Sequence, residues 1–512
     1  MARLQEYESL EPMRLHQLSP IFLFLDTIKE FFLLIILILF TSRSSSWELY
    51  GIGFAAIFVL VRMISFRFFK YWILPHELVV KSGVFFRQER HIPYERVQNI
   101  NQTQGPLHRL FGVGKVQLES ASGTKPEAEF NVISLAAINA IRNAVEKRSS
   151  DKGSDEQAGV AAVEAPVKPA PLLGLAAIDL VKHGVITNQG MIPVAIVMGF
   201  LFQQEEFLYD LVLPKLQVIF PSLSTLDPAA LVATPLLLIS ALIGLVLFAL
   251  MFFWVLSIAV SFFRFFGFTL SKQQDKLKAE MGLLTRHTAS APLRRIQKIT
   301  LQEGVLHRLF KAASITCKTA GNAPDNNSQS KSFHYLAPLI DRSRVQEFLD
   351  NVQAEIPWQQ LFDNNTHWTA IPFRAWTRMV KIPLLLSLIA GVVLWFVAPW
   401  WALLVIPLCA WSIYATRKLA RSMAYWQSGD LIAYKSGWLS KRLSVVQLKK
   451  AQVVRLSENP FDRRRNMASL YVDTAGFSMA DHNIDIPYLD KPNALHLQDE
   501  INQALCRLEF EW

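Results

Sequence analysis

The chain has 512 residues, a formal net charge of +10 and a mean hydropathy of +0.24. This length is more than one compact domain normally uses, and the apolar residues are concentrated in runs, which is typical of a membrane protein rather than a soluble one. In a membrane protein a basic excess indicates positively charged cytosolic loops and contact with membrane lipids that are anionic, so no nucleic-acid partner is expected.

The first 20 residues carry acidic side chains and no continuous apolar core. They do not have the pattern of a cleavable signal peptide. We therefore expect residues 1–20 to form a cytosolic N-terminal segment and the first apolar run to direct membrane insertion.

Apolar runs then come in pairs, and each pair predicts a transmembrane hairpin. The hairpins are expected over residues 21–66, 172–263 and 382–416, which gives six transmembrane helices. A helix needs about 20 residues to cross the hydrocarbon core. The runs at 31–40 and 191–202 are shorter than that, so a re-entrant or interfacial helix is the alternative for either run.

Basic residues lie beside the hairpins rather than inside their loops. They are Arg67, Lys70, Arg264, Lys272, Arg374, Arg378, Lys381, Arg417, Lys418 and Arg421. The loop at 203–230 has instead an acidic excess. Because lysine and arginine stay on the cytosolic face, we expect a multi-pass protein of the bacterial cytoplasmic (inner) membrane, with both termini and all segments between hairpins in the cytosol.

The cytosolic segments are each long enough for one small domain. These domains are expected at 67–148, 264–356 and 417–512. Residues 149–171 are rich in alanine, proline and acidic residues without periodicity, which predicts a flexible linker. Residues 357–381 form a cytosolic segment before the third hairpin.

The three cytosolic segments are copies of one another. Two sets of residues align fifteen positions apart, namely Gly83, Gly282 and Gly437, and then Gln98, Gln297 and Gln452. The string LHRLF occurs at 107–111 and again at 306–310. Chance does not explain such agreement in three segments that each follow a membrane pair, so the chain contains an internal triplication.

Each copy has the pattern of several β-strands followed by one helix. A serine–glycine or methionine–glycine pair at 82–83, 281–282 and 436–437 marks a hairpin turn. Apolar residues then alternate with polar ones, as at Val116 and Leu118, which predicts strands with one wet face. A helical stripe ends each copy, as at Val345, Phe348 and Val352. The fold class is therefore α+β, with small antiparallel barrels or sandwiches that are each capped by a helix.

This order of motifs resembles the bacterial membrane-flanked domain, a bacterial PH-like family. The resemblance is carried by residues 82–83, 92–93, 97–98, 107–112 and 116–123. Three copies after paired helices are similar to the three-repeat, YdbT-type members of that family. The resemblance implies three PH-like domains, a smaller single-domain relative as partner, and a role in envelope homeostasis. The third copy departs from the pattern, because Gln447 replaces the proline and 461–465 replaces LHRLF.

No catalytic, cofactor-binding or metal-binding site is expected. His108 and His307 occupy equivalent positions but lack repeated partners, so we interpret LHRLF as a structural turn in which Leu107, Leu110 and Phe111 fill the core. The three cysteines, Cys317, Cys409 and Cys506, are far apart, and none lies in a CxxC pair or near a histidine cluster, so neither a disulfide framework nor a zinc site is supported.

Basic clusters are the candidate binding residues for lipid headgroups or an anionic partner. They are Arg294, Arg295, Lys298, Lys441, Arg442, Lys449, Lys450, Arg463, Arg464 and Arg465. A basic residue near an anionic leaflet contributes about 1 kcal/mol to membrane association. The alternative is a solvated face that is basic because of the cytosolic bias in lysine and arginine.

We expect a non-enzymatic membrane scaffold that presents three cytosolic PH-like domains to a membrane-protein partner, to anionic lipid, or to both. A transporter or lipid-handling channel built from the six helices is the alternative, although the sequence offers few polar residues for a path through them. A lipid-modifying enzyme lacks a recognisable nucleophile–base pair. The sequence leaves the partner's identity and the oligomeric state open.

Overall fold

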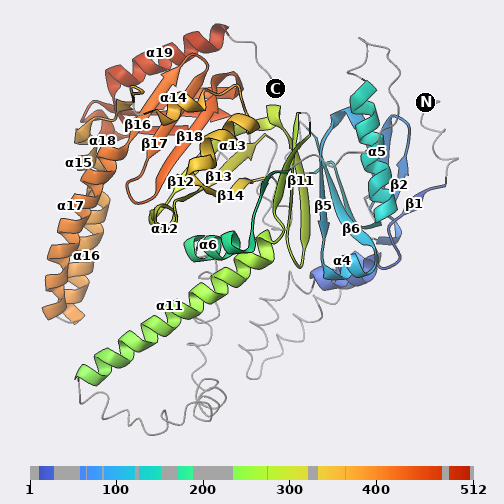
Figure 1. The fold of residues 1–512 in the computed structure, drawn as a ribbon, viewed down its shortest axis with the longest axis horizontal. Helices are drawn as coiled ribbons and strands as arrows, with labels where there is room; N and C mark the ends of the chain where they lie inside the picture. Colours follow the sequence, from blue (N-terminus) through green and yellow to red (C-terminus); the bar gives the residue numbers. More distant parts are fainter. Residues whose placement is uncertain are drawn as a thin grey trace.

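The three repeats fold into three β-rich modules that lie in one row (Figure 1). The computed structural model describes residues 11–27, 53, 58–64, 66–83, 86–120, 126–151, 171–187, 235–273, 275–320, 333–363, 365–397, 399–474 and 484–507. Module 1, module 2 and module 3 denote the described parts of 11–151, 171–363 and 365–507.

Module 1 consists of two antiparallel sheets and a C-terminal helix. Its elements are β1 (Met13–Arg14), β2 (Lys70–Ile73), β3 (Glu77–Ser82), β4 (Gln88–Pro93), the 3-10 turn η1 (Tyr94–Arg96), β5 (Val97–Gln104), α4 (Pro106–Leu110), β6 (Val113–Ser120), β7 (Ala128–Ser134) and α5 (Leu135–Asp151). Strands β1 to β4 form the first sheet, and β5 to β7 continue into the second. Ile138, Ile141 and Val145 of α5 are buried in the module core, as their helical spacing predicts.

Module 2 repeats this order around longer helices. Its elements are β8 (Pro171–Gly174), α6 (Ala177–Thr187), α11 (Pro235–Phe265), β9 (Thr269–Gln273), β10 (Lys276–Met281), β11 (Arg286–Pro292), η4 (Leu293–Arg295), β12 (Ile296–Glu303), α12 (Val305–Leu309), β13 (Ala312–Thr319), β14 (Tyr335–Asp341), η5 (Arg342–Arg344), α13 (Val345–Val352) and α14 (Trp358–Phe362). The stripe on α13 is buried through Val345, Phe348 and Val352, as its spacing predicts.

Module 3 has the same plan. Its elements are β15 (Thr369–Ala370), η6 (Phe373–Ala375), α15 (Trp376–Met379), α16 (Lys381–Val397), η7 (Pro399–Leu404), α17 (Val405–Ser422), β16 (Ala424–Ser428), β17 (Leu431–Ser436), β18 (Lys441–Gln447), η8 (Leu448–Lys450), β19 (Ala451–Ser457), α18 (Pro460–Arg463), β20 (Met467–Thr474), β21 (Ile484–Asp490) and α19 (Lys491–Arg507). The β-rich domain with a C-terminal helix, expected for each copy, is thus present three times.

One glycine in each copy makes the tight hairpin loop possible. Gly83, Gly282 and Gly437 have φ of +106°, +110° and +89°. A Cβ at any of them would come within 2.0 Å of a carbonyl oxygen three residues on. Because side chains rarely tolerate this backbone conformation, the repeated glycine is a requirement of the loop.

Neighbouring modules are joined by β-strand pairing at their edges. In the first seam β5 pairs antiparallel with β11, and in the second seam β12 pairs antiparallel with β18. Each seam thereby creates one seven-stranded sheet. Thr103 lies opposite His287 in the first seam, and Gln302 lies opposite Arg442 in the second. These positions are equivalent in the repeats, so both seams have the same register.

A short strand that precedes each helical insertion pairs with the strand that follows it. β1 pairs with β2, β8 with β9, and β15 with β16. The first of these pairs brings part of segment 1–20 into module 1, and the third brings part of segment 357–381 into module 3. In module 3, α16 and α17 therefore leave and return at adjacent strands of one sheet.

The expected six transmembrane helices are not what the structure describes. Within the described residues, two helices are long and apolar enough to cross a membrane, over Phe373–Phe396 and Ala402–Ser422, and a shorter apolar helix covers Leu250–Phe265. The run at 31–40 and the run at 191–202 lie outside the described residues, as does most of the linker at 149–171. The six-helix architecture is therefore corrected to one apolar hairpin, α16–α17, with α11 as a further apolar helix.

Gly437→Ala should destabilise module 3, because the new Cβ would lie 1.9 Å from the Ser440 carbonyl oxygen at a positive φ. We expect a cost of about 1–3 kcal/mol, measured as a lower melting temperature of the detergent-solubilised full chain. Gly174→Ala is the matched control, because its φ is not positive and the nearest atom is 4.0 Å away. Equal melting temperatures for the two variants would contradict the prediction.

Candidate functional site: the seams between modules

The first seam is polar and brings a half-buried carboxylate of module 1 near a buried arginine of module 2. Asn99 and Asn101 on β5 each donate a side-chain hydrogen bond to Glu119, at 3.3 and 2.7 Å. Arg295 of module 2 is 6% exposed and interacts electrostatically with Glu119. Burial raises the pKa of Glu119, and Asn99, Arg295 and Asn101 oppose that rise. Burial likewise lowers the pKa of Arg295, and Glu119 opposes that change. Each charge therefore compensates the burial of the other.

The second seam combines an apolar core with polar bonds. Ala433 and Val445 of module 3 belong to the same buried cluster as the core of module 2. Lys450, which is 5% exposed, donates from Nζ to the carbonyl oxygen of Ile296 at 2.8 Å. Lys449 lies 3.0 Å from Glu355 and lowers the pKa of that carboxyl group. The second seam therefore resembles a domain core more than a surface contact.

One basic position links module 2 and module 3 each to the module before it. Arg96, Arg295 and Lys450 end the 3-10 turns η1, η4 and η8 at equivalent places in the repeats. Arg295 and Lys450 are buried in the first and second seams, whereas Arg96 of module 1, the first module of the described chain, is exposed. The burial of this position therefore follows the presence of a neighbour.

A second basic position links module 1 and module 2 each to the module after it. Arg109 of α4 donates to the Leu283 carbonyl oxygen at 3.0 Å, and Arg308 of α12 donates to the Leu439 carbonyl oxygen at 2.9 Å. Both acceptors lie in the loop that follows the repeated glycine. We name this contact the arginine clasp. It joins the LHRLF motif of one module to the glycine loop of the next.

The interpretation that Leu107, Leu110 and Phe111 fill the core is wrong. These three side chains are 43%, 74% and 49% exposed, and the equivalent Leu309 is 73% exposed. The leucines of α4 and α12 thus face outward, while the arginines of these helices reach the next module. His307 Nδ1 accepts the backbone N–H of Gly304 at 3.3 Å, which is a helix-start role. Burial lowers the pKa of His307.

The predicted basic clusters separate into seam residues and exposed residues. Lys298 pairs with Val446 in the second seam, and Arg465 donates to the Thr377 hydroxyl. With Arg295, Lys449 and Lys450, these residues make contacts within the protein. The exposed members are Arg294, Lys441, Arg442, Arg463 and Arg464. Among them, Lys441 and Arg442 also pair with Glu303 and Gln302 along the second seam. A binding role for lipid headgroups stays a prediction for the exposed members, since a buried cation such as Lys450 does not reach a bilayer.

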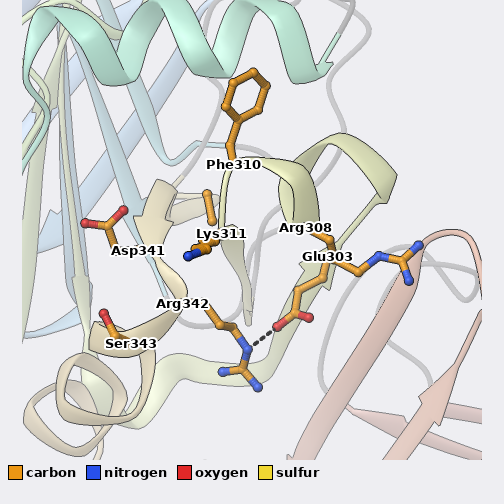
Figure 2. Close-up of a pocket in the computed structure, with 8 residues that line it drawn as sticks. Glu303, Arg308, Phe310, Lys311, Asp341, Arg342 and Ser343 are labelled. Carbon is orange, nitrogen blue, oxygen red and sulfur yellow. Dashed lines mark ion pairs between the residues drawn. The ribbon is translucent and has the colours of Figure 1, made fainter.

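A cavity of about 520 Å³ opens in module 2 beside α12 (Figure 2). It is lined by Glu303, Arg308, Phe310, Lys311, Ala312, Asp341, Arg342 and Ser343. Arg342 lies 2.6 Å from Glu303, and Arg308 makes the arginine clasp. Since two of its three cations are engaged within the protein, we assign no ligand to this cavity.

Among the described residues, no group of three or more histidine, cysteine, aspartate or glutamate side chains is placed to hold a metal ion. Cys317 is buried, Cys409 is half-buried in α17, and Cys506 is exposed on α19. Burial raises the pKa of the Cys317 thiol. A buried thiol of this kind is a poor nucleophile.

Sequence comparison matches the bacterial PH domain model at residues 20–149, 221–356 and 380–505. The chain belongs to the bacterial PH domain family. The three matches include strands β2–β7, β9–β14 and β16–β21, and each match extends into the segment that precedes the first of these strands. The UPF0699 transmembrane protein YdbT of Bacillus subtilis is 24% identical over 502 residues, which cover 94% of this chain and 95% of that protein. No solved structure matches. The chain is thus similar to YdbT over nearly its full length, with three bacterial PH domains.

The seams between the bacterial PH domains are the contact surfaces that sequence reasoning missed. The side chain of Arg109 contacts a carbonyl group 174 residues away, and no local period encodes such a contact. One signal was present in the repeat alignment. Arg295 and Lys450 place a basic residue at the same position, directly before β12 and β19, and both are buried, which is unusual for arginine and lysine.

Lys450→Ala should loosen the second seam, because it leaves the buried Ile296 carbonyl without its 2.8 Å donor. The expected cost is about 1–3 kcal/mol, seen as faster hydrogen exchange in β12 and β18 of the full chain. Arg96→Ala removes the equivalent but exposed residue and should change stability by less than about 0.5 kcal/mol. Unchanged exchange at the second seam in Lys450→Ala would refute this role.

Proposed function

We propose that this chain is a non-enzymatic membrane scaffold whose three bacterial PH domains form one continuous surface for binding another membrane protein. The observation that carries the proposal is the pair of seams, because they hold the three modules at fixed spacing in one row. A row of related modules favours multivalent binding over binding by independent domains. Envelope homeostasis is the process that the family resemblance suggests for it.

A membrane position for the modules is supported by the base of α16 and α17. Arg417 lies over the ring of Trp376 at 4.3 Å, and Arg421 lies over the ring of Phe373 at 4.9 Å. Arginine with aromatic rings at the end of an apolar hairpin is typical of a membrane–water interface. We propose that this interface is the cytosolic face of the bacterial inner membrane, and that both termini lie on that face.

Contact with anionic lipid is the second part of the proposal. Arg417, Lys418 and Arg421 lie together on the last turns of α17, immediately after the apolar run. Each basic residue near an anionic surface contributes about 1 kcal/mol. Lipid contact at this place would hold module 3 against the bilayer without a defined headgroup pocket.

Affinity purification of the tagged full chain from solubilised membranes tests the scaffold function. We expect one membrane protein to co-purify reproducibly, together with lipid enriched in anionic species. The double variant Arg417→Gln, Arg421→Gln should lower the anionic lipid fraction and keep the protein partner, because these residues lie at the membrane end. If no protein co-purifies reproducibly and no lipid preference is found, the result would argue decisively against the scaffold.

Cys506 offers a test of orientation, because it is exposed on α19 while Cys317 is buried. A membrane-impermeant maleimide should leave Cys506 unlabelled in intact cells and should label it after permeabilisation. Cys506→Ser is the control that assigns the signal to this thiol. Labelling of Cys506 in intact cells would place module 3 outside and overturn the proposed topology.

A further inference from the structure

Strand β19 has the same place in module 3 as β5 and β12 have in modules 1 and 2. β5 and β12 each pair with a strand of the following module. β19 is the end strand of its three-stranded sheet and pairs with β20 on its other side. Within the described chain, the seam side of β19 is therefore open.

The exposure of side chains on β19 shows what a seam would cover. Gln297 is 6% exposed in the second seam, whereas its equivalent Gln452 is exposed. Asn99 is 3% exposed in the first seam, whereas its equivalent Val453 is 53% exposed. An apolar strand edge with free backbone groups is a template for pairing with another strand. β19 thus has the exposed edge of a seam without the neighbouring strand.

Module 3 also has the arginine that makes the arginine clasp in modules 1 and 2, but within the described chain no following module supplies the acceptor. Arg463 on α18 is equivalent to Arg109 and Arg308, each of which donates to the glycine loop of the next module. Arg463 is exposed on the described surface. Its helix is fixed in place, because Asn459 caps it through the N–H groups of Phe461 and Asp462. A preorganised donor therefore lies beside the open strand edge.

We propose that β19 and Arg463 form a docking site for a fourth module of the same fold, supplied by a separate polypeptide. This inference rests on the proposed scaffold function and names the partner's class. The partner contributes a strand equivalent to β11 and β18, in the register that both seams share. Its glycine loop supplies the carbonyl oxygen that accepts from Arg463.

The charges on β4 argue against a second copy of this chain as the partner. β4 is the strand of module 1 that corresponds to β11 and β18, and its Glu89, Arg90 and His91 are exposed. In the shared register Arg90 would lie opposite Arg455, where the second seam has Ser444 opposite Thr300. Like charges directly opposite each other destabilise a strand pair. The partner strand is therefore expected to carry a small, uncharged residue at that position.

Photocrosslinking in membranes tests the site with the full chain. A photoreactive residue in place of Val453 should form an adduct with the strand before the second sheet of a bacterial PH domain in another protein, identified by peptide mass spectrometry. The same residue in place of Leu495, exposed on α19, is the control and should not form this adduct. An adduct with residues 88–93 of this chain, an adduct with a protein that lacks the fold, or no adduct would overturn the proposal.

Arg463→Ala and Arg464→Ala form a matched pair of neighbouring exposed arginines. Co-purification of the fourth module should fall about tenfold in Arg463→Ala, the change typical for loss of a hydrogen bond to a charged group, and should stay unchanged in Arg464→Ala. If the partner co-purifies equally with both variants, the docking site is refuted while the scaffold stands. If no partner co-purifies even with the unaltered chain, both ideas fall together.

Discussion

Edge-to-edge strand pairing at a constant register is the interaction on which the arrangement of this protein depends. A β-sheet edge has unpaired backbone donors and acceptors, and leaving them open invites uncontrolled association. Here each inner edge is satisfied by the next module, so three small domains share two long sheets. Because a slip of one residue would turn every side chain to the opposite face, the common register also fixes how the modules are oriented.

The two seams reach this result with different chemistry. The second seam has a shared apolar core, while the first relies on the half-buried Glu119, the buried Arg295 and two asparagines. Removing one partner of such a pair leaves the other charge uncompensated, so Arg295 and Glu119 each depend on the neighbouring module. The excess of basic residues, first interpreted as a lipid-binding surface, is thus partly used to connect modules.

The sequence predicted what depends on local patterns and missed what depends on distant contacts. The turn at Gly437 and the buried stripe of α13 were predictable, because a positive φ and a helical period leave local traces. The clasp from Arg308 to the loop at Leu439 was not, because its two ends are 131 residues apart. Leu110 was assigned to the core since an apolar residue in a short motif is indistinguishable from a core residue until its neighbours are known. The six-helix prediction failed for a related reason. Hydropathy measures composition along the chain, and within the described residues the two helices long and apolar enough to cross a membrane cover Phe373–Phe396 and Ala402–Ser422.

The pairing of β15 with β16 has a mechanical consequence. The ends of α16 and α17 emerge from adjacent strands of a sheet that continues through the second seam into module 2. Tilting this helical pair would therefore exert a torque on one end of a rigid plate whose far side carries another module. A force on the two helices would reach module 2 through this shared sheet and would load the pairing of β12 with β18 in shear.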